Sequence, residues 1–327
     1  YLFAPDKTGR AVIERLAAAA GRGVEVKLLL DDVGSMNLGE EELAPLERAG
    51  GEIARFLPVR RSFALRNLAN LRNHRKLVIA DQRRVWSGGT NIGERYIGAE
   101  AEAGCFRDLA FQLEGPATAA FAGVLRSDWF FSTGKRIPLK TADEIDASGD
   151  SVVQPMPSGP DVEGDGLFEV VSSLIYAAKT RLWISTPYFI PGETLGVALG
   201  LAARRGVDVR VVTPERSDHR ICDLARGPYL RELDRAGGRV LRYRPSMLHA
   251  KAILVDDQVA MIGSSNFDQR SFFLNFELAS FFYSSSEIET LAAWFEDTFA
   301  ACEEGPRRTS YLEETLQGVA RVFSPLL

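Results

Sequence analysis

The sequence predicts an α/β protein built from two homologous α/β/α sandwich halves related by a pseudo-twofold axis. Three observations support this fold class. A histidine–lysine motif occurs twice with the same spacing, further segments repeat around it, and helical patterns alternate with apolar strands in both halves. Such alternation is typical of α/β sandwiches. A chain of 327 residues, 46% of them hydrophobic, suffices for two domains that each bury a core.

The first half is expected to begin with a helix and a strand in "AAAAGRGVEVKLLL" (17–30). Gly23 follows an arginine at the end of the helical pattern, where a left-handed cap and a positive charge are both favoured. "LERAGGEIARF" (46–56) then predicts the end of a second helix, a turn and a second strand. "NHRKLVIADQRRVWSGGTN" (73–91) predicts a β-hairpin, because an apolar run leads through "ADQRRV" into another strand.

The second half repeats these segments in the same order. "GLAARRGVDVRVVT" (200–213), "LDRAGGRVLRY" (233–243) and "LHAKAILVDDQVAMIGSSN" (248–266) correspond to the three segments of the first half. Between the repeats, "STGKRIPLKTADEIDASGD" and "MPSGPDVEGDG" are poor in apolar residues and rich in turn formers. We therefore expect a first half at 1–140, a linker at 141–165 and a second half at 166–327.

The two ends of the chain bear on membrane attachment. "YLEETLQGVARVFSPLL" places Leu312, Leu316, Val319 and Phe323 on one helical stripe, which we expect to pack on the core rather than insert into a membrane. No apolar stretch has the length that a membrane span needs. The chain starts at Tyr1 without an initiator methionine, so we expect that an upstream segment is missing.

The repeated motif carries residues suited to chemistry at phosphorus. Its positions are His74, Lys76, Asp81, Gly88 and Asn91 in the first half and His249, Lys251, Asp256, Gly263 and Asn266 in the second. A neutral imidazole is a capable nucleophile, and a protonated one can give a proton to the leaving oxygen. Lysine and asparagine can donate to phosphoryl oxygens as negative charge builds on them. Lysines rather than metal ligands adjoin both histidines, so neither a metal nor another cofactor is expected.

Four carboxylates are assigned supporting roles. Each histidine should have a carboxylate that orients it. Alignment of "FRDLAFQL" with "NFELASFF" makes Asp108 and Glu277 the candidates. Asp81 and Asp256 are expected to hold the hairpin turns, where aspartate is common.

One position differs between the two motifs. Gly89 stands where the second half has Ser264, so a hydroxyl is missing from one side. We therefore expect the two halves to be inequivalent at the site.

Two H-x-K-x4-D elements, each followed by G-[GS]-x-N, resemble the phospholipase D superfamily, and "FRDLAFQLEGPA" with "MLHAKAILVDDQVAMIGSSNFDQRSFFLNFEL" resembles its bacterial cardiolipin synthases. The resemblance covers essentially the whole chain. It implies a phosphohistidine intermediate shared between His74 and His249, with the two lysines and two asparagines holding the phosphoryl group. It also implies that His74 is the nucleophile and His249 the acid, whereas the symmetric motif does not choose between them. Members of the family commonly carry hydrophobic N-terminal segments.

Charge favours a lipid partner over a nucleic acid. The net charge of −5 disfavours a general nucleic-acid surface, which depends on phosphate neutralisation. "PVRRSFALRNLANLRN", absent from the second half, interleaves apolar residues with Arg60, Arg61, Arg66 and Arg72. This pattern suits an anionic lipid surface beside the site. The alternative is a solvated basic loop whose leucines pack inward.

These observations and the resemblance together predict a phosphatidyltransferase that forms cardiolipin from phosphatidylglycerol. A hydrolytic phospholipase D would use the same residues with water as acceptor. A phospholipase D-like nuclease and a lipid-binding protein without activity are further alternatives, and intact motifs in both halves weigh against the last. The expected location is the bacterial cytoplasmic membrane. The sequence leaves the lipid headgroups and the oligomeric state open.

Overall fold

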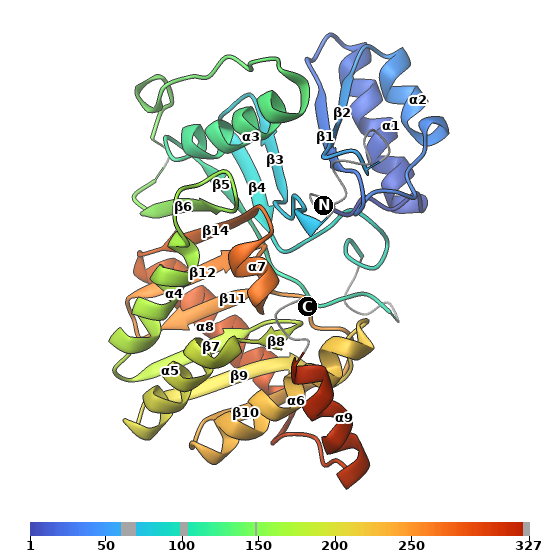
Figure 1. Ribbon diagram of the computed structural model, residues 1–327. Helices are drawn as coiled ribbons and strands as arrows, with labels where there is room; N and C mark the ends of the chain where they lie inside the picture. The colour runs from blue at the N-terminus through green and yellow to red at the C-terminus, as the bar shows by residue number, and fades with distance from the viewer. Residues whose placement is uncertain (60–69, 99–103, 148, 323–327) are drawn as a thin grey trace.

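A computed structural model describes residues 1–59, 70–98, 104–147 and 149–322 (Figure 1). Its largest sheet belongs to the second half and has eight strands in the order β15-β10-β9-β7-β11-β12-β14-β6. These are β6 (Val153–Ser158), β7 (Arg181–Ser185), β9 (Asp208–Pro214), β10 (Arg239–Tyr243), β11 (Ala252–Val255), β12 (Val259–Gly263), β14 (Glu277–Phe282) and β15 (Cys302–Glu304). The pairs β7–β9 and β9–β10 are parallel and the other neighbours antiparallel, so the sheet is mixed.

Helices cover both faces of this sheet (Figure 1). α4 (Gly166–Ala177), α5 (Gly192–Arg204) and α6 (Arg220–Arg235) lie on one face, and α8 (Ser285–Ala300) lies on the other. Successive strand residues point to opposite faces, so Leu182 joins the first core and Trp183 the second. The second half is thus an α/β/α sandwich. The short elements β8 (Phe189–Ile190), β13 (Phe267–Asp268) and α7 (Gln269–Phe273) lie at one end of it.

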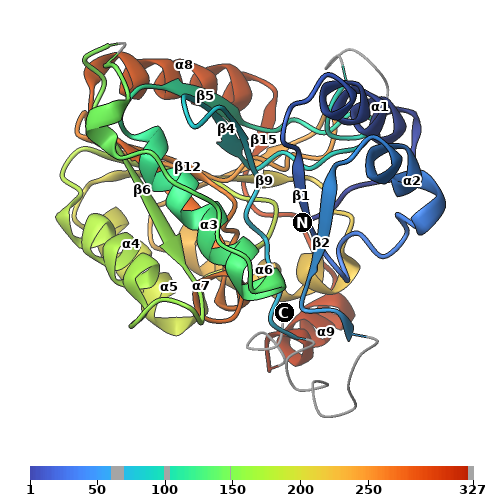
Figure 2. The ribbon, with the colours of Figure 1, turned by 90° about the horizontal axis from the view of Figure 1, so that it is seen from above.

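The first half has the predicted order of helix, strand, helix, strand and hairpin. It contains α1 (Lys7–Gly21), β1 (Lys27–Asp31), α2 (Glu40–Arg48), β2 (Glu52–Phe56), β3 (Leu77–Ala80), β4 (Arg84–Gly88), β5 (Ala110–Glu114) and α3 (Thr118–Thr133). Its strands form two sheets, a parallel β1–β2 pair and an antiparallel β3–β4–β5 sheet. In the described residues, no strand stands between β1 and β3 as β7 stands between β9 and β11. Figure 2 shows β1 and β2 with α1 and α2, apart from β4 and β5.

Two matching backbone contacts join the halves next to the motifs. Asn73 forms a parallel bridge with Phe276, and Arg107 forms one with Leu248. The N–H of His74 donates to the carbonyl of Phe276 at 2.8 Å. The first motif therefore runs beside the segment that leads into β14, and the second motif runs beside the segment that leads into β5. The second contact is the first with the halves exchanged, as a pseudo-twofold relation would produce.

The predicted linker at 141–165 contains β6, a strand of the second-half sheet. β6 pairs antiparallel with β14 from Ser158 opposite Glu277 to Val153 opposite Phe282. The sheet of the second half therefore begins before residue 166, where the prediction placed its start. Pro155 and Pro157 gave this segment a linker-like composition, but β6 is an edge strand, where proline is tolerated.

α9 (Tyr311–Val322) packs along α6, but not through the apolar stripe that was expected to do so. Leu312 is 70%, Leu316 51% and Val319 54% exposed, and Phe323 lies outside the described residues. The buried residues of α9 are instead Gln317, which accepts from Arg231 of α6 at 2.6 Å, and Ala320, which joins the apolar cluster that includes Leu230 and Leu233 of α6. Across the described parts of the chain, we found no helix with the length and apolar character needed to span a membrane.

Candidate active site

The two histidine motifs meet in one buried site made by both halves. His74 lies just before β3 and His249 just before β11, and their residues are only 8% and 6% exposed. Lys76 and Lys251, two residues further on, each contact the histidine of their own motif. The side-chain ammonium of Lys76 donates to the carbonyl of His74 at 2.6 Å. Lys251 Nζ lies 3.0 Å from each ring nitrogen of His249.

Each histidine contacts a carboxylate from the opposite half. Nδ1 of His74 lies 3.0 Å from both carboxylate oxygens of Glu277, and Nδ1 of His249 lies 2.7 Å from Oδ2 of Asp108. Alignment of the halves singled out both carboxylates but gave no sign of this exchange. A carboxylate that accepts the Nδ1 proton leaves Nε2 as the reactive nitrogen. Both histidines are therefore oriented for chemistry at Nε2.

His74 and Glu277 form a neutral imidazole beside an ionised carboxylate. Burial lowers the pKa of His74 to about 3, with Lys76 acting in the same direction and Glu277 opposing it. Burial would raise the pKa of Glu277, but His74 and Lys76 beside it lower that pKa to about 2. At neutral pH the imidazole of His74 therefore has a free electron pair, which a nucleophile requires.

The second pair lies in a similarly charged environment. Burial and then Lys251 lower the pKa of His249, while Asp108 opposes both. Burial also lowers the pKa of Lys251 to about 8 and that of Lys76 well below its usual value. A bound phosphate would favour the charged forms of these lysines and of His249, because an opposite charge stabilises a buried cation. The site is thus prepared to take up an anion together with protons.

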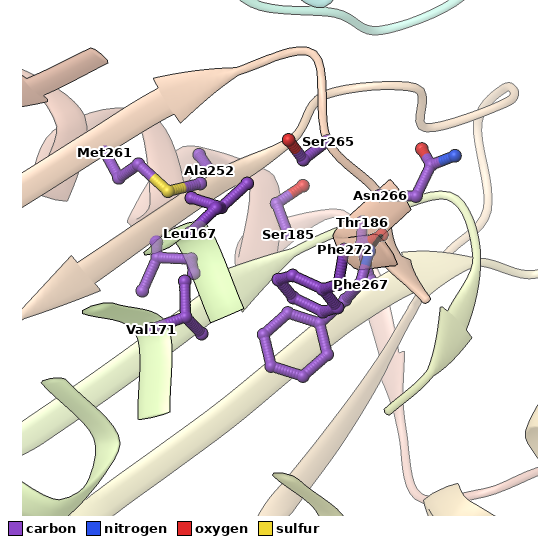
Figure 3. Close-up of a pocket in the computed structure, with 11 residues that line it drawn as sticks. Leu167, Val171, Ser185, Thr186, Ala252, Met261, Ser265, Asn266, Phe267 and Phe272 are labelled. Atoms are coloured by element: carbon purple, nitrogen blue, oxygen red, sulfur yellow. Dashed lines mark hydrogen bonds between the residues drawn. The ribbon is translucent and has the colours of Figure 1, made fainter. Parts of the chain in front are cut away.

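The two asparagines of the motifs flank the site. Asn91 is 4% exposed, and its Oδ1 accepts from the N–H of Leu2 at 3.4 Å. The buried Oδ1 of Asn266 has no hydrogen-bond partner in the described residues. Figure 3 shows the amide of Asn266 pointing away from the apolar side chains of Leu167 and Val171, at the edge of a pocket of about 10 Å³. That pocket has room for about one water, so it is too small to hold a substrate.

The motif glycine and serine explain how the halves differ. Ser264 Oγ donates to Glu277, whereas Asp108 receives its bond from the N–H of Leu109 at 2.8 Å. A Cβ atom on Gly89 would lie 2.5 Å from Oδ1 of Asp108. The shorter Asp108 therefore needs glycine beside it, and the longer Glu277 takes a hydroxyl in the equivalent place. The environments of the two histidines differ accordingly.

Asp81 and Asp256 lie in the hairpin turns and away from the reactive nitrogens. Both have positive φ, 54° and 49°, a conformation that aspartate tolerates in turns. The carboxylate of Asp256 also accepts from the N–H groups of Lys179, Thr180 and Arg181 at 3.0, 2.8 and 3.0 Å. These bonds attach the β11–β12 turn to the start of β7. Both aspartates thus contribute to structure next to the motif.

Sequence reasoning missed a buried arginine beside the first motif. Arg75 donates to Asp128 at 2.6 Å, to Asp161 at 3.0 Å and to the carbonyl of Glu277 at 3.0 Å. It therefore joins the first motif to α3, to the loop after β6 and to β14. Arg75 stands in an arginine-rich stretch, which obscured this role. The only signal in the sequence was its place between His74 and Lys76.

Aromatic rings close against both imidazoles and were also missed. The ring of Tyr1 lies 4.7 Å from that of His74, edge to face, and the ring of Tyr96 lies 5.1 Å from that of His249. Edge-to-face packing of this kind is favourable between aromatic rings. Neither tyrosine belongs to the repeated motif, so no spacing pointed to them.

The lipid-surface prediction is wrong for Arg72. This residue is 2% exposed, and its Nη1 lies 3.5 Å from Oδ1 of Asp31, at the end of β1. Asp31 is itself buried and also accepts from the N–H of Asn73 at 2.9 Å, so Arg72 neutralises a carboxylate in the interior. The other three predicted surface arginines, Arg60, Arg61 and Arg66, lie outside the described residues.

Comparison with known proteins identifies the family of the chain. A family model described as "Cardiolipin synthase, PLD-like domain" matches residues 1–122 and 171–299. The chain belongs to this family. Among its curated members, cardiolipin synthase of Halalkalibacterium halodurans is 36% identical over the whole chain, which spans 66% of that protein's length. Cardiolipin synthase A of Pseudomonas putida GB-1 is 37% identical over the whole chain, which spans 69% of its length.

A solved structure has a similar fold. The crystal structure of phosphatidylserine synthase from Haemophilus influenzae Rd KW20 superposes on 99% of this chain and 86% of its own, with a TM-score of 0.69. Its sequence identity is 15%, so the likeness concerns the fold alone.

Proposed function

We propose that the protein is a phosphatidyltransferase that forms cardiolipin from two molecules of phosphatidylglycerol through a phosphohistidine. The observation that carries this proposal is the pair of buried histidines in one site, each contacting a carboxylate through Nδ1. Membership of the cardiolipin synthase family supports the choice of lipid substrate. Such a substrate would require the protein to act at a membrane, and the bacterial cytoplasmic membrane is the proposed location.

In the first step, Nε2 of His74 attacks phosphorus and the bond from phosphorus to the glycerol headgroup breaks. His249, protonated once the phosphate is bound, gives its proton to the departing glycerol oxygen. A phosphatidyl group is then attached to His74, and His249 is neutral. Lys76 and Lys251 balance the charge on the phosphoryl oxygens as the transition state forms.

In the second step, a hydroxyl of another phosphatidylglycerol attacks the phosphorus. His249 accepts the hydroxyl proton as the new phosphorus–oxygen bond forms and the phosphorus–nitrogen bond to His74 breaks. Cardiolipin leaves, and both histidines return to their starting protonation states. The low pKa of His74, about 3, supports its assignment as nucleophile, because its imidazole is unprotonated when substrate arrives.

The test is turnover of phosphatidylglycerol, labelled in the phosphate, in detergent micelles with rapid quenching. We expect cardiolipin and glycerol in equal amounts and a labelled covalent adduct. His74→Ala should abolish the adduct, and His219→Ala serves as the control because His219 is exposed. His249→Ala should slow the reaction roughly 10²–10⁴-fold, and adduct formation should recover with a p-nitrophenyl phosphodiester, whose leaving group needs little protonation.

Three results would contradict the proposal in different ways. Phosphatidic acid in place of cardiolipin would identify a hydrolytic phospholipase D with the same covalent chemistry. Cleavage of single-stranded DNA with no lipid turnover would identify a nuclease. A labelled adduct on His249 in the His74 variant would exchange the roles of the two histidines.

A further inference from the structure

A charged cavity of about 360 Å³ lies between α6, the ends of β9 and β10, and α9. No residue of either histidine motif lines it. Six arginines contribute to its wall against three carboxylates, Glu215, Asp223 and Glu313. The arginines are Arg216, Arg220, Arg226, Arg231, Arg242 and Arg307. This local excess of positive charge stands out in a chain whose net charge is −5.

Arg226 is the buried donor of the cavity. Its residue is 6% exposed, and its Nη1 is buried without a hydrogen-bond partner among the described residues. Its Nη2 donates to the carbonyl of Glu215 at 3.1 Å and lies 3.0 Å from Asp223. One edge of the guanidinium is therefore satisfied and the other is not. A buried charged donor without an acceptor is unfavourable, and an anion in the cavity that Arg226 lines would supply the missing acceptor.

Further positive charge lies around the cavity without carboxylate contacts. Arg216 and Arg220 are exposed, and within the described part of the chain no carboxylate lies within ion-pair distance of either. Arg231 donates to the neutral Oε1 of Gln317 at 2.6 Å. By contrast, Arg242 contacts both Glu215 and Glu303. Several guanidinium groups thus face one space with charge left uncompensated.

We propose that this cavity is a second anion site that binds a phosphate group, with Arg226 as its buried donor and Arg216 and Arg220 at its entrance. Guanidinium groups match the oxygen geometry of phosphate and bind it through paired hydrogen bonds. The site involves none of the catalytic residues, so it does not depend on the proposed reaction. Both a soluble phosphate and the phosphate of a lipid headgroup carry the required chemistry.

The neighbouring surface favours the lipid source. Glu313 and Gln317 of α9 line the cavity, while Leu312 and Leu316 on the adjacent side of the same helix are 70% and 51% exposed. Figure 1 shows α9 along α6 at the periphery of the molecule. A helix with an exposed apolar stripe beside a basic site suits the interface of an anionic membrane. A headgroup in the cavity would place this stripe against the same lipid layer.

The test compares two charge-reversed variants of equal net charge. Arg216→Glu with Arg220→Glu alters the cavity, and Arg15→Glu with Arg235→Glu alters exposed arginines on α1 and at the end of α6. Titration calorimetry measures the number of inorganic phosphate ions bound per chain. Cosedimentation measures affinity for phosphatidylcholine vesicles with and without phosphatidylglycerol. Thermal melting of both variants confirms that they fold.

We expect the cavity variant to bind one phosphate fewer than the control variant. Its affinity for the anionic vesicles should fall about tenfold or more. Loss of the phosphate with unchanged vesicle affinity would keep the site and assign it to a soluble phosphate. Equal phosphate stoichiometry in both variants would overturn the proposal, even if vesicle binding fell, because the arginines would then act as general surface charge. Arg226→Gln, which keeps the side chain polar, must also lose the phosphate for the proposal to stand.

Discussion

The carboxylates that contact the two histidines differ in length, and so do their surroundings. Glu277 is held by the hydroxyl of Ser264 and by the amide of Asn275 at 3.2 Å. The side chain of Asp108, one methylene shorter, accepts from the N–H of Leu109 and lies close to Gly89. Both carboxylates nevertheless reach Nδ1 of a histidine. Two different local arrangements therefore hold a carboxylate against a histidine, and each arrangement can be altered by its own substitution.

Replacing Glu277 by glutamine should prevent attack by His74, the proposed nucleophile, without removing its side chain. The amide can donate its N–H to Nδ1 of His74, which would place the ring proton on Nε2 and remove the free electron pair there. We expect kcat to fall roughly 10²–10⁴-fold with little change in KM, measured as the rate of covalent adduct formation.

Glu289→Gln on the exposed surface of α8 is the matched control and should retain full activity. Full adduct formation in the Glu277 variant would show that this carboxylate does not select the tautomer of His74.

Gly89→Ala and Ser264→Ala should separate the two histidines kinetically. The added methyl displaces Asp108 and so misorients His249, whereas the lost hydroxyl loosens Glu277 and so affects His74. Each variant should lose about 1–3 kcal/mol of transition-state stabilisation, the cost of an unsatisfied buried polar group. With a p-nitrophenyl leaving group, the defect of Gly89→Ala should largely disappear and that of Ser264→Ala should persist.

Equal defects of both variants on both substrates would refute the assignment of His249 as the acid. The two variants serve as controls for each other, because both substitutions are small and lie at equivalent positions of the two motifs.

For single residues, the sequence predicted the residue types of the site, and alignment of the two halves identified both carboxylates. It could not predict which histidine each carboxylate contacts, because that depends on a backbone bridge between Asn73 and Phe276, far apart in the chain. It also grouped Arg72 with surface arginines, although that side chain neutralises the buried Asp31. Charge patterns do not reveal buried ion pairs.

Arg75, within the first motif, makes hydrogen bonds to a helix and to two strands. It leads into β3 and contacts α3 through Asp128, the end of β6 through the carbonyl of Ser158, and β14 through the carbonyl of Glu277. Asn73 supports the same carboxylate of Asp128 at 2.9 Å. These bonds fix the approach of the first motif to the strands of the second half.

Arg75→Met should destabilise the fold strongly, because it leaves the buried carboxylate of Asp128 without its cation. We expect a loss of about 3–5 kcal/mol in the free energy of unfolding, as for other broken buried pairs. Urea denaturation provides the measurement. Arg84→Met is the control, since Arg84 and its partner Glu114 are 59% and 40% exposed and such a pair contributes at most about 1 kcal/mol. Similar losses in the two variants would mean that Arg75 is no more than an ordinary ion-pair partner.

The sequence predicted most elements correctly and erred on β6 and α9. Pro155 and Pro157 made β6 resemble a linker, since only its position at the edge of the sheet makes them acceptable. The apolar stripe of α9 indicated core packing, yet that stripe is exposed and Gln317 is buried. Gly227 of α6 leaves space for this side chain, because a Cβ at Gly227 would lie 2.5 Å from Oε1 of Gln317. Periodicity shows that a helix has an apolar face, but not what that face contacts.

For the molecule as a whole, burial of the site should make stability depend on pH. The pKa of His74 falls from 6.5 in an exposed chain to about 3 in the folded protein, and that of His249 is also lowered. Between these values the unfolded chain binds more protons than the folded one, so stability falls as pH falls below about 6.5. The lowered pKa of Glu277, about 2, adds a further loss only below its ordinary value of 4.5.

His74→Gln should therefore flatten the decline in the free energy of unfolding between about pH 7 and pH 5, measured by urea titration at several pH values. His219→Gln, at an exposed position, should leave the decline unchanged. An unchanged decline in the His74 variant would mean that this imidazole is not held neutral by the folded structure.

The exchange of carboxylates between the halves also has an evolutionary consequence. An assembly of two separate copies of one half would have to carry the same residue beside both histidines, since one gene would encode both. A single chain removes that restriction, and the pairs Gly89 with Asp108 and Ser264 with Glu277 have diverged. Because each carboxylate serves the histidine of the other half, neither half could specialise alone: a change in one motif alters selection on its counterpart. A single chain would thus allow one histidine to specialise in attack and the other in proton transfer, the roles proposed for His74 and His249, while keeping the two inherited together.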